Sequence, residues 1–328
     1  MIVSKDVVSE MARFISSKDC QSIIFLTGAG VSVASGIPDF RSPGGMYDTL
    51  KPELITATSM QRKMMETDPT SVVYKDMFLQ NSFPYMEVRR PFILGTQKQK
   101  WKATIAHRFM ELLHEKTDKL TRVYTQNIDG LDHQCKKIPK EKIINVHGTL
   151  SEVACENCSE EMDFDEFCDK VSHNIKDIYE IDENAPSAST PIVCPSCGKA
   201  TVKPKTVLFG SSLPSEFFDC SDEDVMNADL LIVAGTSLVV FPANSLVYRV
   251  NDDCKRFVVN MDAVGQELGL NFYGNDYSTI NDRRDFFAKG PCEDIFLDLI
   301  DKLGWMEDLQ RMSKQLPPAS ASLLRDDA

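Results

Sequence analysis

Five short apolar runs, separated by long stretches of mixed sequence, limit the folds open to this chain more than any other feature. They lie at residues 23–26, 120–124, 143–146, 230–234 and 257–260. Apolar residues recur at helical spacing before the first run, from Val7 to Ile15, and again between runs at 103–113. Strands that alternate with helices form parallel sheets covered on both faces. We therefore predict an α/β fold built on such a sheet.

The composition indicates a folded chain that does not act on nucleic acid or at a membrane. With 328 residues, of which 42% are hydrophobic, the chain can bury a large core. No apolar run approaches the roughly 20 residues of a membrane span, and the first residues lack the pattern of a secretion signal. A net charge of −13 disfavours phosphate contacts, which need clustered Lys and Arg. We expect a cytoplasmic or nuclear protein, or one present in both compartments, with a basic protein substrate.

Two segments interrupt the alternation of strands and helices. Residues 47–100 are rich in Met, carry four prolines and lack a clear buried strand, which predicts a helical insertion. Residues 150–204 contain paired cysteines and form the second insertion. The predicted sheet domain then consists of 1–46, 101–149 and 205–310, and the two insertions form a smaller module. Residues 311–328 include a stretch rich in Pro, Ser and Ala, so we predict a disordered tail.

The second insertion has the ligand pattern of a metal site. Its cysteines form two C-x-x-C pairs, Cys155 with Cys158 and Cys194 with Cys197. The 35 residues between the pairs exceed the usual spacing of about 15–20. Four thiolates can still close a tetrahedral zinc site, and such a site leaves no position for a catalytic water. We predict one structural zinc ion, and four free thiols are the alternative.

Small or polar residues follow four of the predicted strands. They are Gly28-Ala29-Gly30, the segment 125–129, His147-Gly148 and Gly235-Thr236-Ser237. Ligands bind at the carboxyl edge of such sheets, where glycines let backbone N–H groups approach a phosphate. The dinucleotide fingerprint G-x-G-x-x-G is incomplete, because Val33 occupies its third glycine position, and this disfavours a nicotinamide oxidoreductase. A histidine at the same edge can accept a proton near neutral pH.

The order of these motifs is similar to that of one enzyme family. The segment 32–42, Ser-Val-Ala-Ser-Gly-Ile-Pro-Asp-Phe-Arg-Ser, matches a cofactor loop almost residue for residue, and Thr-Gln-Asn-Ile-Asp at 125–129, His147-Gly148 and the four cysteines follow in the family's order. Across about 20–304 the chain resembles the sirtuins, NAD-dependent protein-lysine deacylases, and most closely their eukaryotic deacetylases. The resemblance implies a Rossmann-like sheet domain, a smaller module with a zinc ribbon, and NAD and zinc as cofactors.

The resemblance also implies roles for individual residues. His147 is the expected general base, and Asn127 acts beside it. The expected NAD-binding residues are Gly28, Ala29, Gly30, Ser32, Gly36, Ile37, Asp39, Phe40, Arg41, Gln126, Asn127, Ile128, Asp129, Gly235, Thr236, Ser237, Asn260, Met261, Asp262 and Cys292. Cys292 is the weakest of these matches, and Asp262 stands where a glutamate is common.

A strand of the sheet domain resembles the sirtuin substrate strand, although two residues depart from the pattern. Lys205 replaces the usual aspartate, and Ser211 replaces the usual glutamate. The expected substrate contacts, made by strand addition to an extended peptide, are Val207, Phe209, Gly210, Val239, Val240 and Phe241. No Tyr-x-x-Arg pair, the family's device for acidic acyl groups, occurs between Met46 and Lys100, so we expect acetyl or longer apolar acyl groups to be preferred over succinyl.

The implied reaction is removal of an acetyl group from a protein lysine, with nicotinamide and O-acetyl-ADP-ribose as products. Histone tails and tubulin are candidate substrates. Mono-ADP-ribosyl transfer and removal of longer apolar acyl chains are the alternative activities, and an NAD-sensing module without catalysis is the non-enzymatic one. Between the cysteine pairs lie ten acidic residues and only two lysines. This acidic insert either attracts a basic substrate or is simply a solvated surface.

Overall fold

A computed structural model describes residues 4–37, 45–272 and 283–324. Within them, a parallel sheet of six strands has the order β3-β2-β1-β7-β8-β9. The strands are β1 (Ile23–Thr27), β2 (Leu120–Thr125), β3 (Ile143–Asn145), β7 (Leu230–Ala234), β8 (Lys255–Asn260) and β9 (Asp285–Lys289). The predicted parallel α/β sheet is confirmed, and the five predicted apolar runs correspond to five of these six strands. The apolar runs did not include β9.

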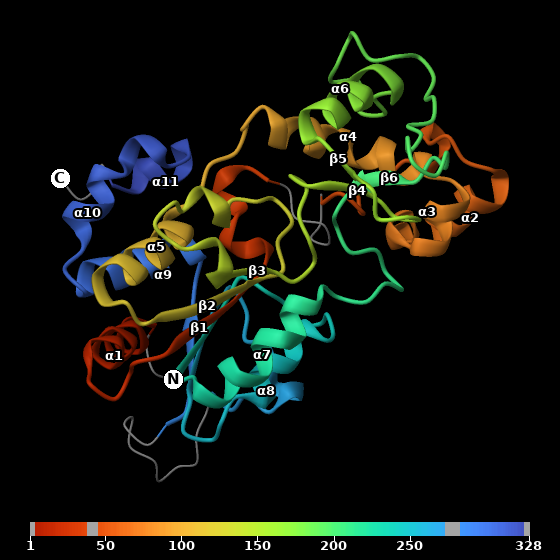
Figure 1. Cartoon of the computed structure of the whole chain (residues 1–328). Helices are drawn as coiled ribbons and strands as arrows, with labels where there is room; N and C mark the ends of the chain where they lie inside the picture. Colours follow the sequence, from red (N-terminus) through yellow and green to blue (C-terminus); the bar gives the residue numbers. More distant parts are fainter. Residues whose placement is uncertain (1–3, 38–44, 273–282, 325–328) are drawn as a thin grey trace.

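Helices cover both faces of this sheet (Figure 1). One face carries α1 (Ser4–Ser16), α5 (Ile105–Thr117), α9 (Cys292–Lys302) and α10 (Met306–Arg311). The other carries α7 (Ser215–Asn227) and α8 (Leu246–Arg249). Side chains alternate along β1, so that Ile23 and Phe25 face the first group of helices while Ile24 and Leu26 face the second. Every residue of β1 and of β7 is buried, as expected for central strands of such a sheet.

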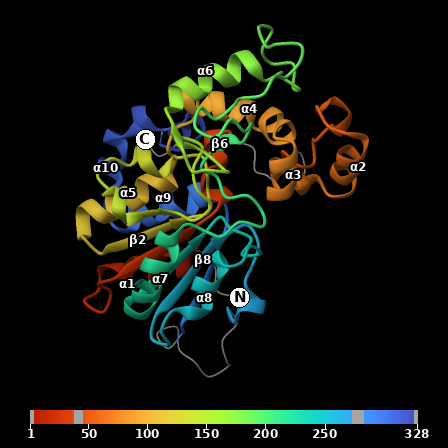
Figure 2. The ribbon, with the colours of Figure 1, turned by 45° about the vertical axis from the view of Figure 1, so that its right-hand side comes forward.

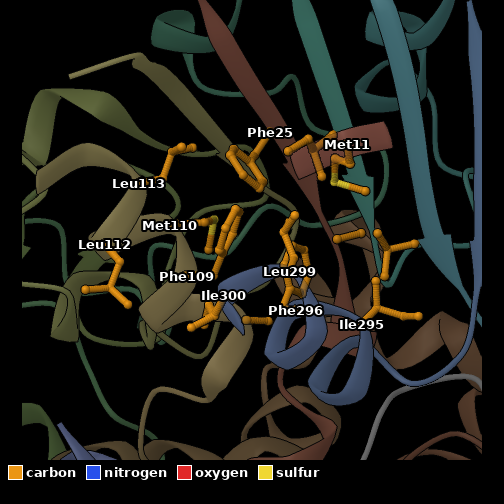
Figure 3. Close-up of a cluster of buried hydrophobic side chains, with 14 of the residues drawn as sticks. Met11, Phe25, Phe109, Met110, Leu112, Leu113, Ile295, Phe296, Leu299 and Ile300 are labelled. Carbon is orange, nitrogen blue, oxygen red and sulfur yellow. The ribbon is translucent and has the colours of Figure 1, made fainter. Parts of the chain in front are cut away.

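Aromatic rings fill the core between the sheet and the larger group of helices. Phe109 of α5 stacks on Phe296 of α9 with ring centroids 5.0 Å apart, and its ring meets that of Phe25 edge-on at 6.2 Å. Figure 3 shows these three rings with Met11 and Leu299 around them. These contacts pack α5 and α9 against the centre of β1. Because a close-packed core is rigid, the loop that follows β1 starts from a fixed position.

The two insertions gather at one end of the molecule (Figure 2). The first consists of helices, α2 (Ser59–Thr67), α3 (Lys75–Gln80) and α4 (Phe83–Gln97). The second contains a sheet with the order β5-β4-β6, formed by β4 (Val153–Cys155), β5 (Glu161–Met162) and β6 (Val202–Pro204), and a helix, α6 (Phe164–Asn174). Buried residues of both insertions form one hydrophobic cluster, which includes Phe78, Tyr85, Val153 and Phe167. A shared core is the physical basis for treating the two insertions as one module.

The expectation of a disordered tail is wrong for residues 311–324. The chain continues through α10 into a short helix, α11 (Pro318–Leu323). Leu309, Met312 and Leu316 are buried against the sheet domain, and Ser320 has no exposed surface. The Pro- and Ser-rich composition suggested a chain without a core of its own, but a few well-spaced apolar residues are enough to bind this segment to an existing core. Residues 325–328 lie outside the described part of the chain.

Candidate active site

The loops that follow β1 and β7 pack directly on each other, backbone against backbone. The N–H of Gly28 donates to the carbonyl of Ala234, and the N–H of Gly30 donates to that of Gly235. A Cβ atom at Gly30 would lie 2.5 Å from the Cα of Gly235, so no larger residue fits there. From the sequence we expected these glycine N–H groups to face a phosphate. The structure instead uses them to hold two loops together, and the glycines are required for that close approach.

A buried polar cluster lies beside this contact, between the loops after β1 and β2. The Asn127 amide donates to the carbonyl of Gly28 at 3.0 Å and to the hydroxyl of Ser32 at 3.1 Å. The Ser32 hydroxyl in turn donates to the Asp129 carboxylate at 2.7 Å. Burial raises the pKa of this carboxyl, while hydrogen bonds from Leu131 and Ser32 favour its charged form. The cluster therefore presents a fixed amide and a fixed carboxylate at the edge of the sheet.

A second set of hydrogen bonds joins the ends of β2, β7 and β8. The Gln126 side chain donates to the hydroxyl of Thr236 at 3.0 Å, and the Asn260 side chain donates to the carbonyl of Thr236 at 2.9 Å. Thr236 thus connects two side chains that the family resemblance implies bind the same ligand. The bonds hold three strand ends in register along the carboxyl edge, where doubly wound sheets bind nucleotides.

His147 follows β3, and its ring has a defined orientation. Its Nδ1 lies 3.0 Å from the backbone carbonyl of Gln126, and because a carbonyl only accepts, Nδ1 carries the proton. Nε2 is then the basic nitrogen of the neutral ring. The backbone carbonyl of His147 accepts from the N–H of Val207 at 2.8 Å, so the residue is fixed from both sides. These contacts suit a side chain that takes up a proton at Nε2.

Gly148 explains how the predicted substrate strand comes so close to His147. Its φ is +74°, and a Cβ atom at this position would lie 1.8 Å from the carbonyl oxygen of Lys205. Only glycine satisfies both requirements. The pairing of His and Gly in the sequence therefore reflects packing as well as chemistry.

The segment 207–210 is bound along one edge by the helical insertion. Phe209 accepts from the N–H of Lys75 at 3.0 Å and donates to the carbonyl of Val73 at 2.9 Å, and its ring meets the Tyr74 ring edge-on at 5.8 Å. In the segment that follows β7, Val239 and Phe241 are 62% and 72% exposed. Exposed apolar side chains of this kind are typical of a surface that binds a partner.

The four paired cysteines form one cluster with the dimensions of a zinc site. All four sulfur atoms lie within 4.8 Å of one another, and the Sγ–Sγ distances of Cys155 to Cys197 and of Cys158 to Cys194 are both 3.7 Å. A tetrahedral ion about 2.3 Å from each thiolate separates the sulfurs by about 3.8 Å. The residues fit zinc, and the long spacing between the pairs is taken up by α6 and the loops around it.

Comparison with known proteins agrees with the geometry. Residues 28–242 match the sequence profile of the Sir2 family. The chain belongs to the Sir2 family. It is 34% identical over 322 residues to the NAD-dependent protein deacetylase sirtuin-2 of Danio rerio, an alignment that covers 96% of this chain and 76% of the relative. It is 32% identical over 321 residues to the NAD-dependent deacetylase sir2A of Dictyostelium discoideum, covering 95% of this chain and 55% of the relative.

A solved structure supports the fold of this Sir2 family member. A chain described under "Structural Basis for the Mechanism and Regulation of Sir2 Enzymes" superimposes with a TM-score of 0.67 at 23% identity, covering 92% of this chain and 98% of that chain. Among the described residues, no helix is both long and apolar enough to cross a membrane.

The remaining NAD-binding residues expected from the family differ in where they lie. Asp39, Phe40 and Arg41 fall outside the described residues. Gly36 has a φ of +80° at the end of a short 3-10 helix, and Ile37 packs against the hydrophobic cluster of the smaller module. At the far end of the sheet, Met261 is exposed, whereas Cys292 is buried with its sulfur 4.0 Å from the carbonyl of Val259. Burial raises the pKa of the Cys292 thiol to about 12, so only its backbone suits contact with a ligand.

Three side chains that we did not predict from the sequence, Lys203, Glu156 and Tyr85, hold the segment that leads to Val207. The buried ammonium of Lys203 donates to the carbonyl of Thr206 at 2.6 Å and pairs with Glu156, which lies between the first two cysteines, at 3.1 Å. Tyr85 hydrogen-bonds the hydroxyl of Thr206 at 2.6 Å. The sequence offers little signal for this burial, because Lys203 and Lys205 flank Pro204 alike and only Lys203 is buried.

Proposed function

We propose that this protein is an NAD-dependent protein-lysine deacetylase that releases nicotinamide and O-acetyl-ADP-ribose. The observation that carries the proposal is the arrangement of His147, whose Nδ1 is fixed on the Gln126 carbonyl, beside the buried cluster of Asn127, Ser32 and Asp129. One basic nitrogen, one amide and one carboxylate meet at the carboxyl edge of the sheet. The named deacetylase relatives, two of which the chain matches over most of its length, support the same activity.

In this proposal each part of the site has a separate task. When bound, NAD would supply a ribose carbon, which the acyl oxygen of the lysine attacks as nicotinamide leaves, and a ribose hydroxyl, which takes up the acyl group while water completes release of the lysine amine. Asp129 and Asn127 hold the carboxamide of the nicotinamide ring, and Gln126 contacts the adjoining ribose. Gly235, Thr236, Ser237 and Asn260 to Asp262 bind the adenosine half, with the backbone at Cys292 at its edge.

His147 removes a proton from a ribose hydroxyl in the proposed mechanism. The fixed Nδ1–H leaves Nε2 to accept this proton, and general-base catalysis of this kind contributes about 10²–10⁴ in rate. Two segments bind the peptide in this proposal, one with Val207, Phe209 and Gly210 and the other with Val239, Val240 and Phe241. The zinc ion has no step of its own, because four protein ligands exclude a reacting water.

The substrate class follows from the family, and individual substrates are proposals. Acetylated proteins with basic flanking sequences suit a chain of net charge −13, and histone tails and tubulin are the candidates that we propose to test. We also propose that the division into a sheet domain and a smaller module places this peptide between them, since Phe209 contacts the helical insertion and Val207 contacts His147.

The deciding experiment combines purified protein, NAD and an acetyl-lysine peptide. We expect nicotinamide and deacetylated peptide to form in equal amounts, and only when both substrates are present. His147→Asn should lower the rate at least about 100-fold, whereas His173→Asn, a change at an exposed histidine on α6, should leave it unchanged. Nicotinamide release with transfer of ADP-ribose to protein and no loss of acetyl groups would establish the transferase alternative instead. An absence of NAD consumption by the wild-type protein would refute both.

A further inference from the structure

The C-terminal segment 313–324, which we call the C-terminal brace, packs against the loop that follows β1. Its helix α11 packs against the 3-10 helix Val33–Ser35 of that loop. We infer that the C-terminal brace orders the cofactor loop 29–37 through a hydrogen bond between Ser320 and Glu293, which makes these two residues positioning residues for NAD. The inference rests on the proposed function, because it takes this loop to bind NAD.

The side chain of Ser320 is buried and hydrogen-bonded to Glu293. It has no exposed surface, and its hydroxyl donates to the Glu293 carboxylate. A buried hydroxyl on a short surface helix costs free energy unless it has a partner. Glu293 lies in the first turn of α9, so this one bond connects the C-terminal brace to the helix that packs beneath the cofactor loop.

Glu293 in turn stabilises the beginning of α5. Its two carboxylate oxygens accept from the backbone N–H groups of Ile105 and Ala106, each at 3.4 Å. The first N–H groups of a helix have no partner within the helix, and a negative charge beside them is favourable. The long distances indicate modest individual bonds, so the charge of Glu293 matters more here than the geometry of either contact.

The start of α5 is joined to the cofactor loop at two points. Thr104, the residue before α5, donates from its hydroxyl to the carbonyl of Val31 at 2.7 Å. The backbone N–H of Lys102 donates to the hydroxyl of Ser35 at 2.9 Å, while its ammonium donates to the carbonyl of Lys314 in the brace at 3.1 Å. Both 3-10 turns of the loop are therefore held by the segment that leads into α5.

Such an arrangement affects ligand affinity more than the chemical step. A loop that is ordered before its ligand arrives loses less conformational entropy on binding, so weakening the brace raises the apparent dissociation constant for NAD. The acetyl-peptide site lies on other segments, 207–210 and 239–241, and is expected to respond little. The signature is a raised KM for NAD with a nearly unchanged kcat.

The test compares Ser320→Ala and Glu293→Gln with two matched controls. Ser322→Ala removes an exposed hydroxyl two residues away that bonds only within α11, and Asp294→Asn removes an exposed charge next to Glu293. We expect both test variants to raise the KM for NAD about fivefold or more, because each removes one partner of the buried hydrogen bond between Ser320 and Glu293. The KM for peptide and the activity of both controls should stay within about twofold of wild type.

Hydrogen exchange provides a second measurement that needs neither NAD nor activity. The amides of Ser32, Ser35 and Gly36 are hydrogen-bonded within the loop and should exchange faster in both test variants but not in the controls. If an active enzyme shows unchanged exchange and an unchanged KM for NAD in both variants, the inference is wrong. If the wild-type protein has no NAD-dependent activity, the proposed function fails, and faster exchange in the variants would still establish that the brace orders the loop.

Discussion

The hydroxyl of Ser32 donates to the carboxylate of Asp129 at 2.7 Å, which links the loop after β1 to the loop after β2. Ser32 also accepts from Asn127, so a single buried hydroxyl sets the position of both side chains assigned to the nicotinamide ring. The residue has no charge and no unusual reactivity. Its importance comes entirely from its place between two groups that must not move.

Ser32→Ala should weaken NAD use more than it weakens the fold. Removing the hydroxyl leaves the Asn127 amide and the Asp129 carboxylate each with one partner fewer, at a cost of about 1–3 kcal/mol. We expect kcat/KM for NAD to fall at least about tenfold. Ser22→Ala, which removes a hydroxyl bonded to Thr121 at the opposite end of β1, is the control and should leave kcat/KM unchanged. Equal losses in the two variants would contradict the role of Ser32.

His107 should make the stability of the protein depend on pH. Burial lowers its pKa to about 4, so the folded protein holds a neutral imidazole where the unfolded chain titrates near 6.5. The contribution of neutral His107 to the free energy of unfolding is therefore fully present above about pH 6.5 and is lost as the pH falls towards 4. Between pH 7 and 5 the loss attributable to this group is about 2 kcal/mol.

His107→Gln is the matched variant for this prediction. His107 completes a capping box with Thr104 at the start of α5, and glutamine suits the same position while carrying no titrating proton. Urea unfolding at pH 7 and pH 5 should show a smaller pH dependence for the variant than for wild type. An identical difference between the two pH values in both proteins would show that His107 is not the group responsible.

Loss of the zinc site should remove activity through the substrate strand. Cys197→Ser should reduce bound zinc from one equivalent to none, because the ribbon depends on four thiolates. The ribbon carries Glu156 and Lys203, which hold the carbonyl of Thr206 next to Val207, so catalysis should be lost together with the metal. Cys220→Ser, at a half-buried cysteine outside the cluster, should retain both. Full activity in a zinc-free variant would contradict this coupling.

Acetyl-lysine should be used at least about tenfold faster than succinyl-lysine, since an unpaired carboxylate in an apolar site costs well over about 1.4 kcal/mol. The structure adds a reason to the missing Tyr-x-x-Arg pair. The hydroxyl of Tyr85 is engaged with Thr206 in a buried contact and is not available to a substrate carboxylate. Matched peptides that differ only in the acyl group provide the measurement. Comparable rates on both would overturn the predicted preference.

Whether the acidic insert attracts a basic substrate must be tested at acidic residues that have no structural role. Several of its acids have structural partners, since Glu161 pairs with Lys205, Asp182 pairs with Arg90 and Asp163 caps α6. Attraction of a basic substrate should therefore be tested with the exposed Glu160 and Glu183, whose side chains have no partner among the residues that the structure describes. Changing both to Gln should raise the KM for a lysine-rich acetyl peptide at low salt and leave kcat unchanged.

A neutral acetyl peptide is the control for this experiment and should barely respond. Salt near physiological strength should reduce the effect, because exposed charges are screened beyond about 8–10 Å. If both peptides respond alike, or neither does at low salt, the acidic insert is only a solvated surface.

Much of the sheet and the site could be predicted because each buried strand ends in a short polar motif. The runs before Gly28, Gln126 and His147 are apolar and brief, and parallel strands bring their carboxyl ends together. β9 was missed because its five residues begin and end with a charge, Asp285 and Lys289, and so the apolar run is only three residues long.

Two other features depend on contacts between distant segments and leave little trace in composition. Gly28 and Gly30 are glycines because Gly235 packs against them, a requirement that no local pattern shows. Residues 311–324 are ordered by the contact of α11 with the loop after β1 and by Met312 and Leu316 in the main core, and a Pro- and Ser-rich sequence read in isolation does not reveal such partners.

The central position of β1 has a consequence for how the chain must fold as it is synthesised. Ile23 pairs with Leu120 on one side and with Leu230 on the other. At synthesis rates of about 5–20 residues per second, β7 emerges roughly 5–20 s after β2. During that interval β1, a strand that is fully buried in the finished protein, has an unpaired edge, which is the usual starting point for aggregation. The order of the strands in the sheet thus makes the newly made chain vulnerable well before the enzyme is complete.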